Sequence, residues 1–226
     1  MRPIHAVVLA AAGLAGLAAA APAARDWSRV AAMKPDGAYV IGNPAAKVKL
    51  VEWASYTCPH CGHFAVQSAP VLKDRMIRSG STSLEVRHMV RDPIDLAAAT
   101  IVRCGGAARF AATHLAMFAG QEKWMATAQT YLSTNAERLN ALPRPQALRQ
   151  LADGIGLSAI GRAQGLTEPQ IAACFANAAA TDKLLALTAS APAEVTSTPT
   201  FFLNGKLLPP GSWADVQPQL VAAGAR

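Results

Sequence analysis

Five short runs along the chain have the apolar pattern of β-strands. Residues 84–90 alternate apolar and polar positions, as a half-buried strand does. Residues 38–41 end in a Gly-Asn-Pro turn signal and predict a short edge strand. The last two runs are separated by Asn204-Gly205, which is typical of a β-hairpin. The five runs are 38–41, 47–54, 84–90, 200–203 and 206–208.

Apolar residues recur at helical spacing after residue 61. Phe64, Leu72 and Met76 belong to this pattern, which continues to Ser79 and ends at a glycine, a common helix stop. The helix would connect the strand runs 47–54 and 84–90. A short β-α-β crossover of this kind favours parallel strands and a right-handed connection.

About 110 residues separate the third strand run from the fourth, far more than one crossover requires. They are rich in Ala, Leu, Gln and Arg and show no clear alternation, so we expect a helical insertion with a break near Pro143 and Pro145. A closing helix is expected over 212–223, with Ser212 as its N-cap, and residues 25–37 form a polar lead-in. The helices predicted in the insertion are 94–119, 121–133, 144–153, 157–163, 167–176 and 178–190.

The first residues have the pattern of a secretory signal peptide. Arg2 and His5 precede an apolar run over 6–20, and small residues follow it with cleavage sites after Ala20 or Ala23. An uncleaved membrane anchor is the alternative, but this run is shorter than the roughly 20 residues that a spanning helix needs. We therefore expect residues 1–23 to be removed and the mature protein to be periplasmic, where disulfides persist.

Composition narrows the function classes. The chain has 226 residues, a formal charge of +7 and 52% hydrophobic residues, which suits a folded protein with a packed core. Its lysines and arginines are scattered singly, whereas a nucleic-acid-binding protein would concentrate them in a stripe. We therefore expect no nucleic-acid partner.

The motif with the clearest chemistry is Cys58-Pro59-His60-Cys61, which lies between the second strand run and the helix after it. Pro59 suits the first position of a helix, where a missing N–H costs nothing. Cys58 would then lie at the helix N-terminus, where free N–H groups and the helix dipole stabilise an anion. That anion would be a thiolate, the form of cysteine that attacks disulfides.

Three chemistries compete for a C-x-x-C pair. A structural zinc site needs further ligands at short spacing, but Cys104 and Cys174 are remote and His60 lies inside the motif. Haem attachment requires a histidine directly after the second cysteine, and Gly62 occupies that position. Redox exchange is favoured, while metal binding and a purely structural disulfide remain alternatives.

The sequence resembles the DsbA-like thiol:disulfide oxidoreductases of bacterial envelopes. The resemblance rests on the C-P-H-C motif, on the Val51-Glu52-Trp53 run before it, and on the segment 196–205 with its Thr-Pro and Asn-Gly pairs. It implies an α/β thioredoxin fold with a helical domain inserted between the β-α-β and β-β-α halves. We expect the thioredoxin-like domain to comprise 37–92 and 193–226, and the insertion to comprise 93–192.

The resemblance also implies roles for individual residues. Cys58 is the expected exposed nucleophile and Cys61 the shielded resolving thiol, with Pro59 and His60 as the dipeptide that tunes their reactivity. Pro199 matches a proline that the family holds in cis beside the dithiol, where the backbone of Thr198 pairs with a substrate peptide. Glu52 matches a buried acid that assists proton transfer. No basic partner for Glu52 is identified, although Glu85 and Arg87 are near the expected place.

Cys104 and Cys174 both fall in the helical insertion. An oxidising compartment and an even number of cysteines favour a structural disulfide between them. Two free buried thiols are the alternative, since cysteine packs readily in protein cores.

The function that these features indicate is an exported dithiol oxidase that introduces disulfides into reduced polypeptides. The resemblance implies no cofactor and a membrane quinone reductase of the DsbB or VKOR type as the partner that reoxidises it. We expect a monomer, because no added dimerisation segment is evident between Arg25 and Pro44. A reductase or isomerase of the same fold, or a non-catalytic metal-binding chaperone, remains an alternative.

Overall fold

The computed structural model describes residues 25–226, so the predicted signal peptide lies outside the described residues. One mixed sheet has the strand order β1-β2-β4-β3-β5-β6. β3 and β4 are parallel, as predicted for the β-α-β unit, and the other neighbouring pairs are antiparallel. The strands are β1 (Ala31–Met33), β2 (Tyr39–Gly42), β3 (Val48–Ala54), β4 (Thr82–His88), β5 (Thr200–Leu203) and β6 (Lys206–Leu207).

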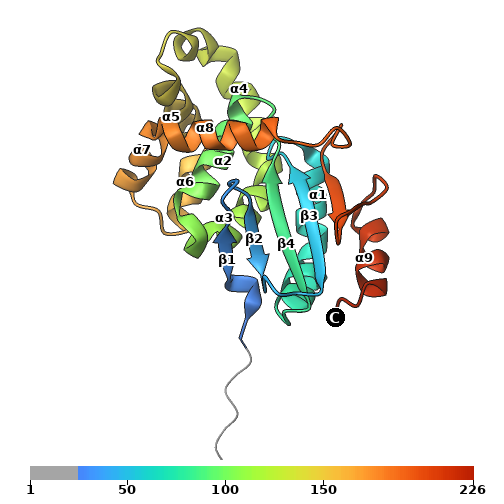
Figure 1. Cartoon of the computed structure of the whole chain (residues 1–226). Helices are drawn as coiled ribbons and strands as arrows, with labels where there is room; N and C mark the ends of the chain where they lie inside the picture. The colour runs from blue at the N-terminus through green and yellow to red at the C-terminus, as the bar shows by residue number, and fades with distance from the viewer. Residues whose placement is uncertain (1–24) are drawn as a thin grey trace, which may run out of the picture.

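Helices cover both faces of the sheet and form a separate lobe beyond one end of it (Figure 1). The lobe comes from the long segment between β4 and β5, so the order of elements confirms the predicted fold class. The helices are α1 (Pro59–Ser68), α2 (Pro93–Cys104), α3 (Gly106–Ala119), α4 (Gln121–Asn140), α5 (Arg144–Gly154), α6 (Leu157–Ala163), α7 (Glu168–Ala176), α8 (Ala178–Ala189) and α9 (Trp213–Ala222). A 3-10 turn, η1 (Trp27–Arg29), precedes β1, and a π-helical segment, η2 (Ala69–Ile77), continues α1.

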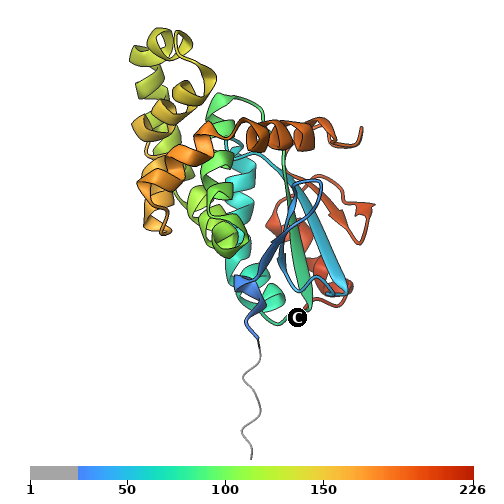
Figure 2. The same cartoon turned by 60° about the vertical axis from the view of Figure 1, so that its left-hand side comes forward.

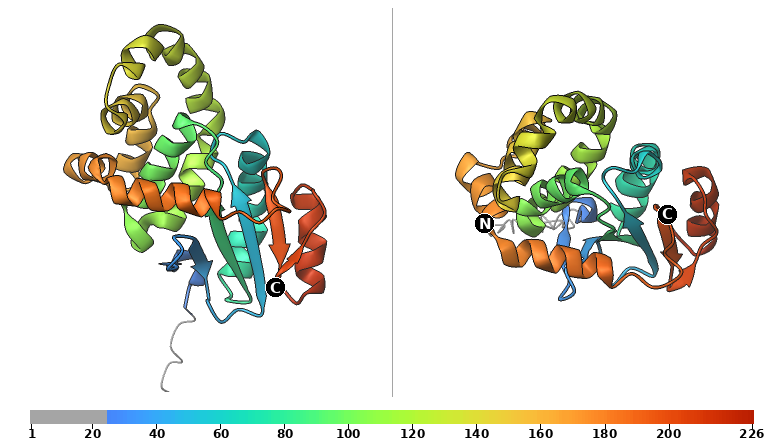
Figure 3. Two further views of the ribbon diagram at one scale, coloured as in Figure 1. Left: turned by 45° about the horizontal axis from the view of Figure 1, so that its top comes forward. Right: turned by 90° about the horizontal axis from the view of Figure 1, so that it is seen from above.

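Alternate residues of β3 point to opposite faces of the sheet and pack into two separate hydrophobic clusters. Leu50 belongs to the main core, to which α1 and α9 contribute Phe64 and Trp213. Trp53 belongs to a second cluster on the α8 side, together with Leu187. Figures 2 and 3 show α8 crossing the sheet on the side away from α1. The end of the insertion therefore also covers the sheet.

Two predictions about the amino-terminal part are wrong. Residues 38–41 were expected to form an edge strand, but the corresponding β2 pairs with β4 on one side and with β1 on the other. β1 and η1 lie in residues 25–37, where only a polar lead-in and no strand was predicted. β1 has only three residues, which are too few for an alternation of apolar and polar residues to be recognised.

The predicted insertion helices match in order, but two boundaries differ. The single helix expected over 94–119 is divided into α2 and α3 at Gly105 and Gly106, and Gly106 has a positive φ of 59° that interrupts a helix. α4 extends to Asn140, beyond the predicted end at residue 133, because it continues through a polar exposed stretch. The predictions for 144–153, 157–163 and 178–190 agree with α5, α6 and α8 within one residue.

Candidate active site

Cys58 lies at the junction between β3 and α1, as predicted. It is the N-cap of α1 and has an extended backbone, with φ −90° and ψ 117°, while Pro59 begins the helix. The backbone N–H groups of His60 and Cys61 face its sulfur and lower the pKa of the Cys58 thiol. The free amides of the first helical turn therefore stabilise a thiolate at this position.

The Thr198-Pro199 segment packs against this junction. Its peptide bond is cis, and Cys58 Sγ lies 3.1 Å from the Thr198 carbonyl oxygen, to which the protonated thiol donates a hydrogen bond. Cys58 is therefore buried, with 2% of its surface exposed. The expected exposed nucleophile is wrong for this state, because the segment before β5 covers the sulfur.

The two thiols of the motif have opposite electrostatic environments. A hydrogen bond from the Cys61 thiol is the largest cause that lowers the pKa of Cys58, to about 5. The Thr198 hydroxyl lowers it further, against the effect of burial. Cys61 is fully buried, and its desolvation raises the pKa of its thiol far above the ordinary value. At neutral pH, Cys58 is the thiolate and Cys61 the proton donor.

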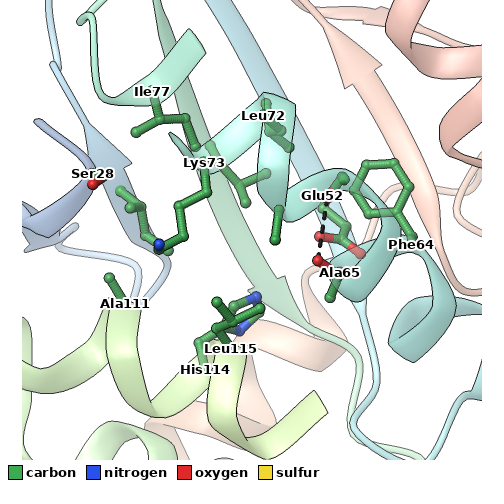
Figure 4. A pocket seen from close by; sticks show the side chains of 14 residues that line it. Ser28, Glu52, Phe64, Ala65, Leu72, Lys73, Ile77, Ala111, His114 and Leu115 are labelled. Carbon is green, nitrogen blue, oxygen red and sulfur yellow. Dashed lines mark hydrogen bonds between the residues drawn. The ribbon is translucent and has the colours of Figure 1, made fainter. Parts of the chain in front are cut away.

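Glu52 lies beneath the dithiol on β3, as the sequence predicts. It is 1% exposed, and its Oε1 has no hydrogen-bond partner among the described residues. Burial, together with the negative charge on Cys58, raises the pKa of Glu52 to about 8. Figure 4 shows its carboxyl group near Phe64 and Ala65, at one end of a cavity of about 40 Å³.

This cavity extends from Glu52 toward η2 and α3. The side chain of Lys73 lies along it, and its ammonium group binds Asp74. His114 lines the cavity from α3. A cavity of this size accommodates water, for which about 10–15 Å³ is needed per molecule. The carboxyl group of Glu52 thus faces a space that is large enough for water.

Neither of the two residues considered as partners of Glu52 is in contact with it. The β3–β4 register places Val86 opposite Glu52, so Glu85 and Arg87 point to the other face of the sheet. There, Arg87 bonds Glu85 at 2.6 Å and also bonds Asp36. Neither Glu85 nor Arg87 is therefore the basic partner of Glu52.

Pro59 and His60 are exposed on the first turn of α1. His63 lies nearby, with its ring centroid 6.4 Å from that of His60. The two histidines are therefore positioned at the surface beside Cys58. Among residues 25–226, no group of three or more Cys, His, Asp or Glu side chains is arranged to hold a metal ion.

Several residues that support the site were not predicted from the sequence. Asp95 on α2 accepts hydrogen bonds from the Ser55 hydroxyl at 2.5 Å and from the Tyr56 amide at 2.8 Å. Asp92, the N-cap of α2, accepts one from the Thr57 hydroxyl at 2.8 Å. The Asp92-Pro93 pair is a recognisable helix start, but nothing local indicates that both carboxylates hold the loop before Cys58.

A buried polar network lies behind this loop. The Tyr56 hydroxyl is 2.9 Å from His114 Nδ1 and 3.3 Å from His88 Nε2. Burial lowers the pKa of both histidines, that of His114 to about 4, so both rings are neutral at pH 7. Gln121, the first residue of α4, contacts the same loop from the insertion.

Cys104 and Cys174 form a disulfide with an S–S distance of 2.00 Å. It joins the end of α2 to α7 and closes a span of 70 residues in the helical insertion. The two cysteines predicted to pair are thus bonded in the structure, well away from the C-x-x-C motif.

Comparison with known proteins places this site in a family. The thioredoxin family model matches residues 34–221. A candidate protein-disulfide oxidoreductase of Rickettsia conorii is 31% identical over 174 residues, which are 75% of this chain and 54% of the relative. A similar protein of Rickettsia felis is 30% identical over the same length. The chain thus spans about half the length of the curated relatives it matches.

Solved structures agree with this assignment. The crystal structure of a protein-disulfide isomerase from Novosphingobium aromaticivorans is 36% identical, with a TM-score of 0.75 over 83% of this chain and 97% of that one. That of alpha-DsbA1 from Wolbachia pipientis is 20% identical, with a TM-score of 0.64 over 81% and 89%, and it supports the fold. Since the family model covers most of the chain and the insertion has its expected place, this protein belongs to the thioredoxin family and has the DsbA-like form of its fold.

Proposed function

We propose that this protein is an exported thiol:disulfide oxidase that introduces disulfides into reduced polypeptides through Cys58 and Cys61. The observation that carries the proposal is the asymmetry of the two thiols, with a Cys58 pKa of about 5 beside a Cys61 pKa far above the ordinary value. Only the reduced protein has the stabilised thiolate, so the asymmetry favours reduction of the enzyme by its substrate.

The size of this preference follows from the Cys58 pKa. At pH 7, a thiol with a pKa of about 5 is about two pKa units into its ionised range, which corresponds to ~2.7 kcal/mol. For a two-electron couple this raises the reduction potential by ~60 mV. A protein with such a dithiol is an oxidant toward thiols whose pKa is ordinary.

The reaction begins with the Cys58–Cys61 pair oxidised to a disulfide. A substrate thiolate attacks Cys58 Sγ, a mixed disulfide forms, and the electron pair of the broken bond goes to Cys61, which takes up a proton. A second substrate thiolate then attacks the substrate sulfur of the mixed disulfide and releases Cys58 as a thiolate. The substrate loses two electrons and gains a disulfide, and the enzyme becomes a dithiol.

Glu52 is the group that we assign to proton transfer at Cys61. It is buried beneath both cysteines, and its pKa of about 8 allows it to carry or release a proton near neutral pH. Its free Oε1 and the cavity toward Lys73 and His114 provide a route to solvent. Water in the cavity would take the place of the missing basic side chain.

The substrate strand would pair with the backbone at Thr198, beside Pro199. This segment already lies against Cys58, so a polypeptide bonded to it would bring its cysteine to the reactive sulfur. Pro59 and His60 are exposed next to Cys58 and would contact the same chain. A membrane quinone reductase of the DsbB or VKOR type would then restore the disulfide.

An isomerase is the second candidate, because the 36% identical crystal structure carries that name. The two functions are separated by refolding assays with ribonuclease A. An oxidase restores activity to reduced, unfolded ribonuclease A and rescues little of the ribonuclease whose disulfides are scrambled. An isomerase rescues scrambled ribonuclease and restores little activity to the reduced form. Failure in both assays would contradict catalysis of disulfide exchange. With scrambled ribonuclease, whose disulfides the Cys58 thiolate can attack, a Cys61→Ala variant should accumulate the mixed disulfide at Cys58.

A further inference from the structure

Gln121 connects the helical insertion directly to the reactive end of α1. It is the first residue of α4 and is 8% exposed. Its side-chain Nε2 donates hydrogen bonds to the Tyr56 carbonyl at 2.6 Å and to the Cys58 carbonyl at 2.8 Å. The same amide group thus binds two backbone carbonyls, one on each side of the Thr57–Cys58 peptide bond.

Gly62 makes room for this amide. A Cβ atom at residue 62 would lie 2.2 Å from Gln121 Oε1 and 2.8 Å from Gln121 Cδ, closer than side-chain atoms approach in proteins. Gly62 lies within α1, and its φ is not among the positive values that favour glycine. Glycine is a poor residue for a helix interior. Its presence here is explained by Gln121 and not by the backbone.

The two carbonyls that Gln121 binds determine how Cys58 is presented. The Cys58 carbonyl also accepts the first hydrogen bond of α1, from the Gly62 amide at 3.2 Å. The Thr198 carbonyl oxygen already lies 3.1 Å from the Cys58 sulfur. A further carbonyl oxygen, that of Tyr56 or Cys58, turned toward the sulfur would repel a thiolate, whereas the N–H groups of His60 and Cys61 attract it. Holding the Tyr56 and Cys58 carbonyls toward α4 leaves those N–H groups facing the sulfur.

We propose that Gln121 is a positioning residue for the dithiol, that it orients the Cys58 backbone so that the N–H groups of α1 face the reactive sulfur, and that residue 62 is glycine to admit it. The proposal rests on the proposed thiol-disulfide exchange for its purpose. In this role the helical insertion contributes a residue to the redox site, because α4 supplies the Gln121 amide.

A double-mutant cycle of Gly62→Ala and Gln121→Ala tests this inference. The readouts are the pH titration of thiolate absorbance at 240 nm, which reports the Cys58 pKa, and the equilibrium constant with glutathione. We expect Gln121→Ala to raise the Cys58 pKa and to change the equilibrium constant about threefold to tenfold toward the oxidised enzyme, the size of one hydrogen bond. Gly62→Ala should act alike, since it displaces the amide.

The double variant should be no worse than Gln121→Ala alone, because the added methyl group then meets open space. Additive effects of the two substitutions would overturn the role of Gly62. Gln121→Met keeps most of the side-chain volume and removes the donor, so a wild-type Cys58 pKa in this variant would overturn the role of Gln121. Thr127→Ala, on the exposed side of α4, is the matched control and should leave both readouts unchanged.

The cycle also separates this inference from the proposed function. The Cys58 pKa and the glutathione equilibrium are measured on the purified protein without a polypeptide substrate. If refolding activity is absent while the cycle behaves as expected, the oxidase proposal fails and Gln121 keeps its role. If refolding activity is normal and Gln121→Met leaves the Cys58 pKa unchanged, the positioning role fails alone.

Discussion

The Thr198 carbonyl oxygen and Cys58 Sγ lie 3.1 Å apart, although 140 residues separate them in the chain. The sheet brings them together. β5 pairs antiparallel with β3, with Trp53 opposite Thr200, so the segment before β5 reaches the place where β3 ends. The long insertion between them leaves this pairing intact, because its first and last helices return the chain to the same end of the sheet.

Replacing Thr198 by valine should raise the Cys58 pKa above its value of about 5. The Thr198 hydroxyl is buried and helps to lower that pKa, and its Oγ1 has no other hydrogen-bond partner among residues 25–226. Valine has nearly the same shape, so the melting temperature should stay the same or rise slightly. Thiolate absorbance against pH measures the effect, and Thr196→Val, in an exposed position of the same loop, is the control. An unaltered Cys58 pKa would show that the hydroxyl does not reach the thiolate.

The contribution of Cys58 to the stability of the reduced protein should increase with pH between about 5 and 9. The folded protein holds Cys58 at a pKa of about 5, below the ordinary value of 9.0, so the unfolded chain binds the additional proton in this range. The contribution is complete above the unfolded pKa and is lost as the pH falls through the folded one. Denaturant unfolding of the wild type and of Cys58→Ala at pH 5, 6, 7 and 8 measures it as the difference between the two proteins, with an expected slope of about 1 kcal/mol per pH unit.

The control for this prediction is reduced Cys58→Ala, which lacks the thiol but retains the other titrating groups. The difference in free energy of unfolding between the two proteins should increase across the same range. A difference that does not depend on pH would mean that Cys58 has no depressed pKa in the folded protein.

Sequence patterns predicted most of the fold because the informative segments are long or chemically marked. The strand around Glu52 and the hairpin at Asn204-Gly205 are examples, and their pairing in one sheet is observed. β1 is not predicted, because three residues are too few to show the alternation of apolar and polar positions that marks a strand. The division at Gly106 was missed because the apolar pattern continues across it, and only a positive φ interrupts the helix.

The candidate site was predictable only as far as its motif extends. Cys58, Cys61 and Glu52 occupy a recognisable local sequence, and the resemblance added Thr198-Pro199. The groups that hold this site in place come from the insertion, as Asp95 and Gln121 do, and their contacts exist only once α2 and α4 pack against the loop. Cys58 is buried because the segment before β5 covers its sulfur, a contact that no local pattern indicates.

Removing the second disulfide should lower stability without changing the active site. The Cys104–Cys174 bond closes a span of 70 residues, and the loop-entropy relation gives about 4 kcal/mol for a loop of that length. Guanidinium unfolding of Cys104→Ala/Cys174→Ala measures the loss, with the Cys58–Cys61 pair reduced in both proteins. The Cys58 pKa should remain at its wild-type value. A loss below about 1 kcal/mol would indicate that the unfolded chain gains little freedom when the bond is absent.

Replacing Glu52 by glutamine should stabilise the protein at high pH and slow its proton-coupled chemistry. Burial raises the pKa of Glu52 from 4.5 to about 8, so in this range the folded protein holds a proton that the unfolded chain has released. The contribution of Glu52 to wild-type stability should therefore fall as pH rises from 4.5 to 8, opposite in sign to that of Cys58, and the variant should lack this contribution. We expect its advantage to be absent at pH 4 and to exceed about 1 kcal/mol at pH 8.

The catalytic half of this prediction depends on the groups that face Glu52. These are Cys58 and Cys61 from α1 and, across the cavity, Lys73 and His114. With glutamine, the carboxyl group that we assign to protonate Cys61 is gone, so the first attack on Cys58, which expels Cys61, should slow at pH 7. Attack of the second substrate thiolate, which releases Cys58, should be little affected. Stopped-flow tryptophan fluorescence with a cysteine peptide separates the two steps. Equal slowing of both steps would assign Glu52 to the stability of the site and not to proton transfer at Cys61.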